Sequence, residues 1–268
     1  MLDIIETVYH QQGQDSLRNV RHSHDECCEI IQISSGSGSV LIGEKIYSMM
    51  PGSIFFINGL ETHATNPQDS AQYVRNKLIV STGFLSELCS VCGMDDIRSR
   101  LFLKNGGACC RVDAALAQQA DSLFERMYRA AAAENYVQGW IASQLVELLL
   151  LVSQRFTEQR EQPESQIDML MRYINENLCE QMDLTMLAQA VHLSKFHMCR
   201  LFKQKTNMTI MEYIISRRIS EAKKLLLYSS QSISEISSQT GFSSVSFFSR
   251  VFREREGKSP SQFRGGQR

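Results

Sequence analysis

The C-terminal part of the chain contains one helical pattern twice, and this duplication decides the fold. The second copy reads Ile233-Ser-Glu-Ile236-Ser-Ser-Gln-Thr-Gly241-Phe-Ser243, followed by Phe248-Ser-Arg-Val-Phe-Arg253. The first copy runs from Leu184 to Lys203. The copies are 49 residues apart before the turn and 50 after it, so the second contains one extra residue just past the turn. Each copy predicts a short helix, a tight turn and a second helix. The chain is therefore expected to contain two helix-turn-helix units, a motif that reads DNA.

Charge is divided unevenly between the two halves of the chain. The formal net charge is −1 at pH 7. Residues 1–163 have a net charge of −6, and residues 164–268 have a net charge of +5. An acidic half joined to a basic half is typical of a DNA-binding domain fused to a domain that does not bind DNA.

The second helix of each unit has an apolar and a polar face. Met198, Leu201 and Phe202 in the first unit, and their counterparts 50 residues later, recur at helical spacing and form the expected buried side. The opposite faces contain the candidate DNA-binding residues, which are Lys195, Phe196, Cys199, Arg200 and Lys203 in the first unit and Ser244, Ser246, Ser249, Arg250 and Arg253 in the second.

Arginine is the commonest reader of guanine in the major groove, and Arg200 corresponds to Arg250 in the repeat. Ser194 and Ser243 are expected to cap the two recognition helices. A basic helix face is often only solvated surface. The matched copies favour DNA contact instead, as do four cations on the helix between the units, Arg217, Arg218, Lys223 and Lys224. The first unit, which has the larger exposed side chains, is expected to contribute more of the specificity.

The N-terminal part is predicted to be rich in strands. Short segments of Ile, Val and Phe, bounded by Gly, Pro and Asn, lie at residues 29–34, 39–42, 45–49 and 53–58. Strands at this spacing suggest a small barrel or sandwich. From Val112 onward the spacing becomes helical, and a strongly apolar helix is expected over residues 137–156. Its apolar surface leaves two alternatives open: burial in its own domain, or a helix–helix dimer interface.

The second repeat is similar to the AraC/XylS family of bacterial transcription regulators. The resemblance rests on Gly241-Phe242, on Phe247-Phe-Ser-Arg-Val-Phe252 and on Gly257-Lys-Ser-Pro260-x-x-Phe263. It implies a bipartite DNA-binding domain over residues 164–268 whose two recognition helices enter successive major grooves. The departures are mild: Asn207, Ser237 and Phe263 replace the usual glycine, alanine and tyrosine.

The N-terminal histidines resemble a cupin motif. His22, His24 and Glu29, with the more distant His63, are similar to the ligand set that binds a divalent metal in cupin enzymes. The AraC/XylS resemblance instead implies a small organic effector bound without metal, and Arg75 is a further candidate for an anionic effector. The expectation is therefore effector binding at these five residues, with no catalytic residue and no cofactor. A metal at the three histidines and Glu29 is the alternative.

Cysteine usage and the absence of a signal peptide indicate the compartment. Cys27-Cys28 and Cys109-Cys110 are adjacent pairs, and the N-terminus lacks the basic and apolar regions of a secretory signal. The longest apolar stretch, about 12 residues, is too short to cross a bilayer. We expect a cytoplasmic protein with reduced thiols and no membrane partner. Cys89-x-x-Cys92 leaves a zinc or redox role as an alternative.

These observations predict an α+β protein of two domains. Residues 1–110 form a cupin-like β-barrel that senses an effector, residues 111–157 are helices for connection and dimerisation, 158–166 is a linker, and 167–268 form the all-α double helix-turn-helix domain, whose units are joined by a long helix. The expected function is sequence-specific transcription regulation, and the family resemblance implies activation. The expected partners are double-stranded promoter DNA, a small-molecule effector, a second copy of the chain and, for an activator, RNA polymerase. The alternatives are a metal-dependent cupin enzyme fused to a DNA-binding domain, and a constitutive DNA binder whose barrel only dimerises.

Overall fold

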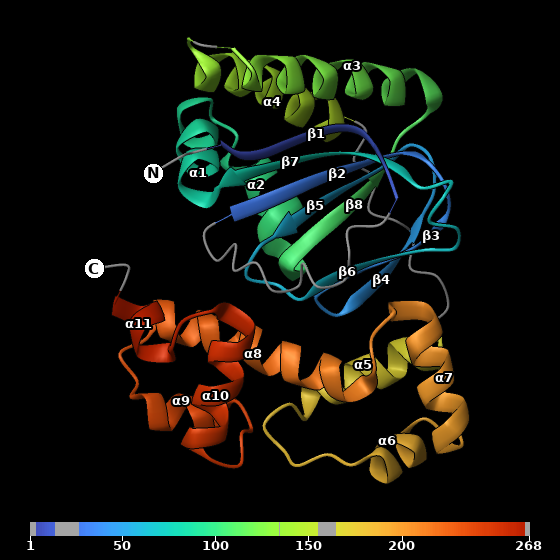
Figure 1. Ribbon diagram of the computed structural model, residues 1–268, viewed down its shortest axis with the longest axis vertical. Coiled ribbons are helices and arrows are strands. Elements are labelled where there is room, and N and C mark those ends of the chain that lie inside the picture. The colour runs from blue at the N-terminus through green and yellow to red at the C-terminus, as the bar shows by residue number, and fades with distance from the viewer. Residues whose placement is uncertain (1–3, 14–26, 134, 155–164, 266–268) are drawn as a thin grey trace.

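The computed structural model describes residues 4–13, 27–133, 135–154 and 165–265. Strands dominate the first part of the chain and helices the second (Figure 1). The strands are β1 (Ile4–Gln12), β2 (Cys27–Ser35), β3 (Gly38–Ile42), β4 (Lys45–Met49), β5 (Ser53–Asn58), β6 (His63–Pro67), β7 (Val74–Ser81) and β8 (Gly107–Arg111). The helices are α1 (Thr82–Val91), α2 (Asp95–Arg98), α3 (Ala114–Ala131), α4 (Val137–Ser153), α5 (Gln166–Glu176), α6 (Leu184–Ala190), α7 (Lys195–Thr206), α8 (Ile210–Tyr228), α9 (Ile233–Gln239), α10 (Val245–Glu256) and α11 (Pro260–Gly265).

The N-terminal domain is built from two antiparallel sheets. One has the strand order β1-β7-β2-β5-β8 and the other the order β4-β3-β6. Strands β2, β5, β7 and β8 of the large sheet are mostly buried, because alternate side chains enter different cores, whereas the edge strand β1 is partly exposed. Ile31 and Ile33 of β2 lie between the sheets, while Cys28 and Ile30 pack under the helices. We call the two sheets the barrel.

Helices α3 and α4 cover the outer face of the large sheet (Figure 1). The apolar residues expected on α4 are mainly buried in this domain. The core between the large sheet and the helices that cover it contains Ile141, Leu145, Leu148, Leu149 and Val152. Trp140 and Leu150 of the same helix stay exposed. Burial within its own domain therefore accounts for most of the apolar surface of α4. The helix ends at Ser153, three residues earlier than expected, and residues 155–164, which contain most of the expected linker, lie outside the described part of the chain.

The C-terminal domain consists of two helix-turn-helix units that share α8. The first half of α8 contributes Ile210, Tyr213 and Ile214 to a core with α5, α6 and α7. The second half contributes Ile219, Ala222 and Leu226 to a core with α9, α10 and α11. One continuous helix thus belongs to both cores and fixes the separation of the two units, as the sequence predicted.

Both turns have a residue in the left-handed conformation at the same position, in spite of the insertion. His192 (φ 53°) and Gly241 (φ 80°) occupy equivalent positions. A Cβ at Gly241 would lie 2.5 Å from the Leu178 carbonyl oxygen, so glycine is required there. The extra residue of the second unit precedes α10, and Ser244 is its N-cap, accepting a hydrogen bond from the Phe247 amide. The expectation that Ser243 caps this helix is wrong, whereas Ser194 caps α7 as expected.

None of the helices in the described ranges combines the length and the apolarity needed to cross a membrane.

Candidate nucleic-acid interface

The recognition helices α7 and α10 present matching surfaces. Met198 and Phe202 of α7 and Phe248 and Phe252 of α10 are fully buried, and they hold each helix against its own unit. Leu201, which was expected in the buried set, is only partly buried, although its counterpart Val251 is buried. Both helices end in a left-handed residue, Asn207 in the first unit and Gly257 in the second.

The residues predicted to contact DNA lie on the outward faces of these helices. Most are exposed: Lys195, Phe196, Arg200 and Lys203 on α7, and Ser244, Ser246, Arg250 and Arg253 at α10. Cys199 and Ser249, at equivalent positions, are partly exposed. Phe196 is 78% exposed, which is a large apolar area for a side chain with no role in the core. A surface pocket of about 550 Å³ beside α10 is lined by Ser249, Arg250, Arg253, Glu254 and Ser259.

An aromatic ring contacts the central arginine of each recognition helix. The Arg200 guanidinium lies 3.3 Å from His197 Nδ1, which must accept the hydrogen bond because arginine only donates. The Arg250 guanidinium lies over the Phe247 ring, 5.5 Å from its centroid. His197 and Phe247 are equivalent in the repeat and are three residues before their arginines. They were absent from the predicted site, and the i, i+3 spacing was the signal that identifies them.

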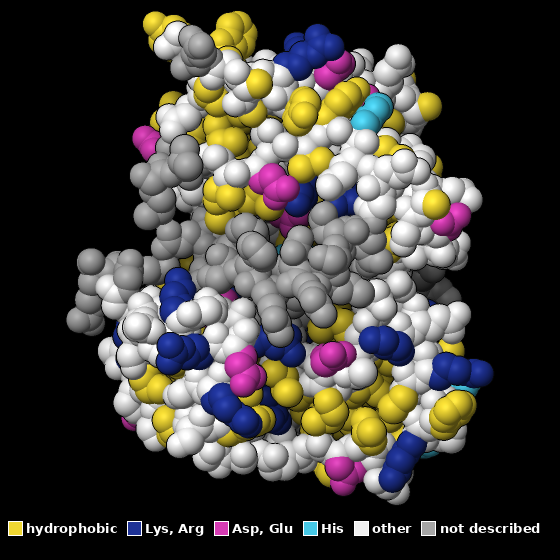
Figure 2. All heavy atoms as spheres, viewed as in Figure 1, with side chains coloured by type: hydrophobic (Ala, Val, Ile, Leu, Met, Phe, Trp, Pro, Cys, Tyr) yellow, Lys and Arg dark blue, Asp and Glu magenta, His cyan; other side chains and the backbone are white. Residues whose placement is uncertain are grey.

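The basic residues of α8 do not form part of this surface. Arg217, Arg218 and Lys223 are buried, contrary to the expectation that they support DNA contact. Arg218 donates to the carbonyl oxygens of Leu178 and Glu180, and Lys223 forms an ion pair with Glu256. These cations therefore stabilise the fold. Helices α7 and α10 present exposed cations instead, and Lys and Arg side chains are spread over the lower, C-terminal part of the molecule (Figure 2).

The candidate effector residues lie in the N-terminal domain. Glu29 Oε2 lies 3.3 Å from His63 Nε2, while His22 and His24 lie outside the described residues. Burial lowers the pKa of His63, but the hydrogen bond to the Glu29 carboxylate raises it, and the pKa stays above its usual value. Among the described residues, no three His, Cys, Asp or Glu side chains lie close enough together to hold a metal ion.

Arg75 lies inside the barrel. It pairs in register with Ile33, whose side chain belongs to the core between the sheets. Its guanidinium donates to the Gly13 carbonyl oxygen and to Gln11 Oε1, and it stacks on the Tyr73 ring. Lys77, two residues along β7, forms a 2.8 Å ion pair with Glu6. The interior therefore holds two buried cations, each of which contacts an acceptor of the chain itself.

Comparisons with known proteins match both domains. The model of the AraC-like ligand binding domain matches residues 4–149, more than half of the chain, and a helix-turn-helix domain model matches residues 187–266. The transcriptional activator RhaR of Cronobacter sakazakii is 25% identical over 252 residues, which cover 91% of this chain and 86% of RhaR. AdaA of Bacillus subtilis, a bifunctional transcriptional activator and DNA repair enzyme, is 34% identical over 103 residues, and the match spans about half of AdaA (49%) and 38% of this chain.

The crystal structure of the DNA-binding domain of AdpA in complex with a target DNA is also similar. It is 29% identical, with a TM-score of 0.36, and the match covers 37% of this chain and 89% of that domain. In the two family-model matches, the helix-turn-helix domain follows the AraC-like ligand binding domain along the chain. With both parts matched in this order, the chain belongs to the AraC family of DNA-binding transcription regulators.

Proposed function

We propose that this protein is a transcription activator whose binding to promoter DNA is controlled by a small molecule held in the N-terminal domain. The observation that carries the proposal is the pair of matched recognition helices, each with an exposed arginine at the same position. Activation is inferred from relatives such as RhaR, which is named a transcriptional activator. An activator of this type has RNA polymerase as a further partner.

In this proposal each arginine reads a base and the flanking residues hold the phosphate backbone. Arg200 and Arg250 pair with guanine edges in successive major grooves. Lys195, Lys203 and Arg253, with the serines at the start of α10, bind phosphates and set the register. Phe196 and Cys199 give the first unit an additional apolar surface for thymine methyl groups. The first unit therefore contributes more of the sequence specificity.

The effector is proposed to bind inside the barrel, where Arg75 and Lys77 favour a polar or anionic molecule. Glu29 and His63 lie on the same inner side and offer further polar contacts. The proposal includes no metal, no other cofactor and no catalytic residue, in contrast to the repair activity named for AdaA. Metal analysis of the purified protein tests this point, since stoichiometric iron, manganese or zinc would favour the cupin enzyme.

We further propose a homodimer formed through the helices of the N-terminal domain. Tyr136 and Trp140, at the start of α4, are 85% and 59% exposed, and Tyr128 at the end of α3 is also exposed. Exposed aromatic side chains at this end of the helix pair favour contact with another protein. A dimer operating in the cytoplasm would place four recognition helices on a pair of half-sites.

The decisive experiment is selection of bound sequences from a genomic DNA pool, repeated with Arg200→Ala and Arg250→Ala. Each variant should lose preference at one position of the site, because a bidentate pair with guanine contributes about 1–3 kcal/mol of discrimination. Arg126→Ala, on the exposed surface of α3, is the matched control and should recover the wild-type site. Unchanged preference in both α7 and α10 variants would contradict the assignment of the grooves.

A further inference from the structure

One face of α8 packs against the N-terminal domain (Figure 1). The residues of this face recur at helical spacing: Tyr213, Ser216, Arg217, Ser220 and Lys224. They contact the turn between β3 and β4 and the loop between β5 and β6. The Tyr213 hydroxyl donates to the Gly43 carbonyl oxygen (3.2 Å), the Thr62 hydroxyl to Ser216 Oγ (3.1 Å), and the Ser220 hydroxyl to the Leu60 carbonyl oxygen (2.6 Å).

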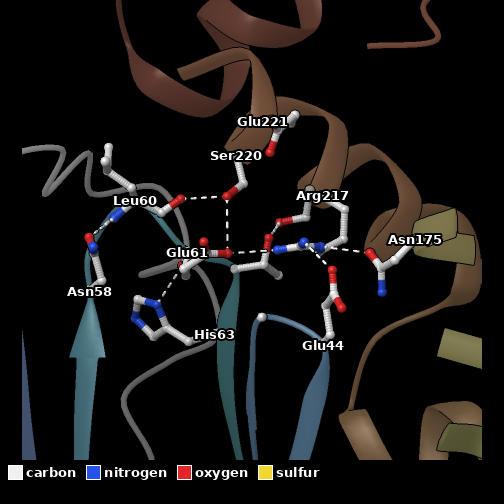
Figure 3. Close-up of polar contacts among 12 residues, drawn as sticks. Glu44, Asn58, Leu60, Glu61, His63, Asn175, Arg217, Ser220 and Glu221 are labelled. Carbon is white, nitrogen blue, oxygen red and sulfur yellow. Dashed lines mark hydrogen bonds and ion pairs between the residues drawn. The ribbon is translucent and has the colours of Figure 1, made fainter. Parts of the chain in front are cut away.

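Glu61 is the charged centre of this contact (Figure 3). Its carboxylate accepts from Arg217 Nη1 at 2.7 Å and from Lys224 Nζ at 2.6 Å. The side chains of Glu61 and Arg217 are each only 8% exposed. Burial raises the pKa of Glu61, but Lys224 and Arg217 lower it more, so the carboxyl group is ionised near neutral pH. Removing one member of such a buried pair leaves the other charge uncompensated, which strongly disfavours the docked arrangement.

Arg217 extends the contact into the first helix-turn-helix unit. Its Nε donates to Asn175 Oδ1 of α5 at 2.9 Å, and its other terminal nitrogen forms an ion pair with Glu44 at 3.0 Å. Glu44 is 55% exposed. The same guanidinium therefore has one buried acidic partner and one that is open to solvent. Solvent screening makes the Glu44 pair the weaker of the two.

His63 connects Glu61 to the inside of the barrel. Its Nδ1 lies 3.0 Å from the Glu61 carbonyl oxygen and its Nε2 lies 3.3 Å from Glu29 Oε2. Glu29 pairs in register with Ile57, a residue of the core between the sheets, so both side chains lie on the inner face. A continuous set of contacts thus runs from the barrel interior through His63 and Glu61 to α8.

The docked arrangement also holds the end of a recognition helix. The Ser39 hydroxyl donates to the Lys205 carbonyl oxygen, and the Asn66 amide donates to the Gln204 carbonyl oxygen, both at 2.7 Å. These carbonyls follow directly after the candidate phosphate contact Lys203. Docking therefore places a domain with a net charge of −6 beside the DNA-facing surface. Like charges on that domain and on the phosphates repel each other, so docking opposes DNA binding.

We propose that Glu61 is a positioning residue for DNA binding, which holds the C-terminal domain in a docked, lower-affinity arrangement through Arg217 and Lys224 and is linked to the barrel interior through His63 and Glu29. The inference rests on the proposed function, in which the N-terminal domain controls DNA binding. A molecule that engages Glu29 or His63 shifts the balance between docked and released arrangements according to its differential affinity for them.

The test compares the full-length chain with Glu61→Gln and Lys224→Gln. Both variants should show faster hydrogen exchange in residues 58–63, and both should bind the selected DNA more tightly, on the order of fivefold, the lower end of typical coupling between sites. The Lys224→Gln result is the more diagnostic, because loss of a cation weakens DNA binding unless that cation holds the docked arrangement. A variant that was merely destabilised would lose DNA affinity.

Glu44→Gln and Glu221→Gln are the matched controls. Each removes the same charge from an exposed partner of Arg217 or Lys224, and each should match the wild type in exchange and in affinity. An equal gain in DNA affinity for Glu61→Gln and Glu44→Gln would show that the gain comes only from the change in net charge. That result would overturn the proposal. The gain of Glu61→Gln should also decrease as salt screens the repulsion.

His63→Ala tests the link to the barrel. Its increases in hydrogen exchange and in DNA affinity should lie between those of the wild type and those of Glu61→Gln. Wild-type behaviour of His63→Ala would overturn that link, and wild-type exchange in Glu61→Gln and Lys224→Gln would overturn the docking role. The exchange measurement needs no DNA. A chain that selects no DNA sequence would refute the proposed function, while its exchange data would still decide whether Glu61 holds the domains together.

Discussion

At the scale of single residues, a neighbouring ring contacts each of the two arginines that are proposed to read bases. A free arginine side chain loses rotamer freedom when it binds a base, and this loss opposes binding. We expect His197 and Phe247 to reduce this loss, because their contacts with Arg200 and Arg250 favour fewer rotamers of the free side chains. The two rings use different forces: a hydrogen bond in the first unit and a cation–π contact in the second.

This difference predicts a specific effect of Phe247→Leu. Leucine keeps an apolar side chain beside Phe242 but removes the ring beneath Arg250. Discrimination at the base read by Arg250 should decrease by about 0.5–1 kcal/mol, the usual size of an exposed cation–π contact. Binding to DNA variants at that base pair measures the change. Bases read by the first unit should be recognised as before, and an equal loss at both half-sites would indicate general damage to the fold.

The thiols are expected to divide sharply by reactivity. Burial raises the pKa of Cys28 and Cys109 to about 12, and that of Cys89 and Cys110 to about 11. These thiols are protonated and protected at neutral pH, so iodoacetamide should modify the exposed Cys92 and Cys179 first. Cys199 on α7 should react more slowly and should be protected by cognate DNA, as peptide mass spectrometry would detect. Equal labelling of Cys199 with and without DNA, with Cys92 as the internal reference, would remove it from the interface.

At the scale of elements, the sequence predicted the strands in which apolar and polar residues alternate or which lie between turn residues. Residues 29–34, 45–49 and 53–58 fall within β2, β4 and β5. Strand β7 was missed because Arg75 and Lys77 interrupt its apolar run, and both charges are buried by partners on β1 and beyond. Strand β8 begins with Gly107 and Ala108, two residue types that are depleted in strands. Its place at the sheet edge is set by pairing with β5.

The candidate site was predictable where a residue's role is local. The exposed faces of α7 and α10 follow from helical periodicity, and the structure places the predicted readers there. The role of α8 was not predictable, because Arg217 is buried by Glu61, which is 156 residues away in the sequence. A cation on a helix is read as solvent-exposed until the acidic partner from another domain is known. Periodicity cannot supply that partner.

The insertion in the second unit predicts different effects for two adjacent serines. Ser244 Oγ accepts from the Phe247 amide at 3.2 Å and caps α10, whereas Ser243 is one residue outside the helix. Ser244→Ala should reduce the free energy of unfolding of this unit by about 1 kcal/mol, the usual cost of losing an N-cap. Ser243→Ala is the matched control and should leave it unchanged. Urea unfolding measures both, and the reverse order would place the start of α10 one residue earlier.

At the scale of the whole molecule, the two domains share an apolar cluster as well as polar contacts. Leu41 and Ala64 of the barrel belong to the same apolar cluster as Leu170, Met198 and Phe202 of the first unit. The second unit has a separate core. Docking is therefore asymmetric: it restrains the first unit directly and the second only through α8. We infer that release of the barrel changes DNA contacts first at α7.

The division of charge between the domains predicts how DNA binding depends on salt. Each phosphate contact releases condensed counterions, so the logarithm of the binding constant falls linearly with the logarithm of the salt concentration. Lys203→Gln removes one exposed cation from α7 and should reduce the magnitude of this slope by about 1 while leaving base preference intact. Arg126→Gln, which removes an exposed cation from α3 in the acidic domain, is the matched control and should leave the slope unchanged. Equal slopes for wild type and Lys203→Gln would show that this lysine touches no phosphate. The DNA-contacting surface of α7 would then be confined to the N-terminal part of the helix, around Lys195 and Arg200.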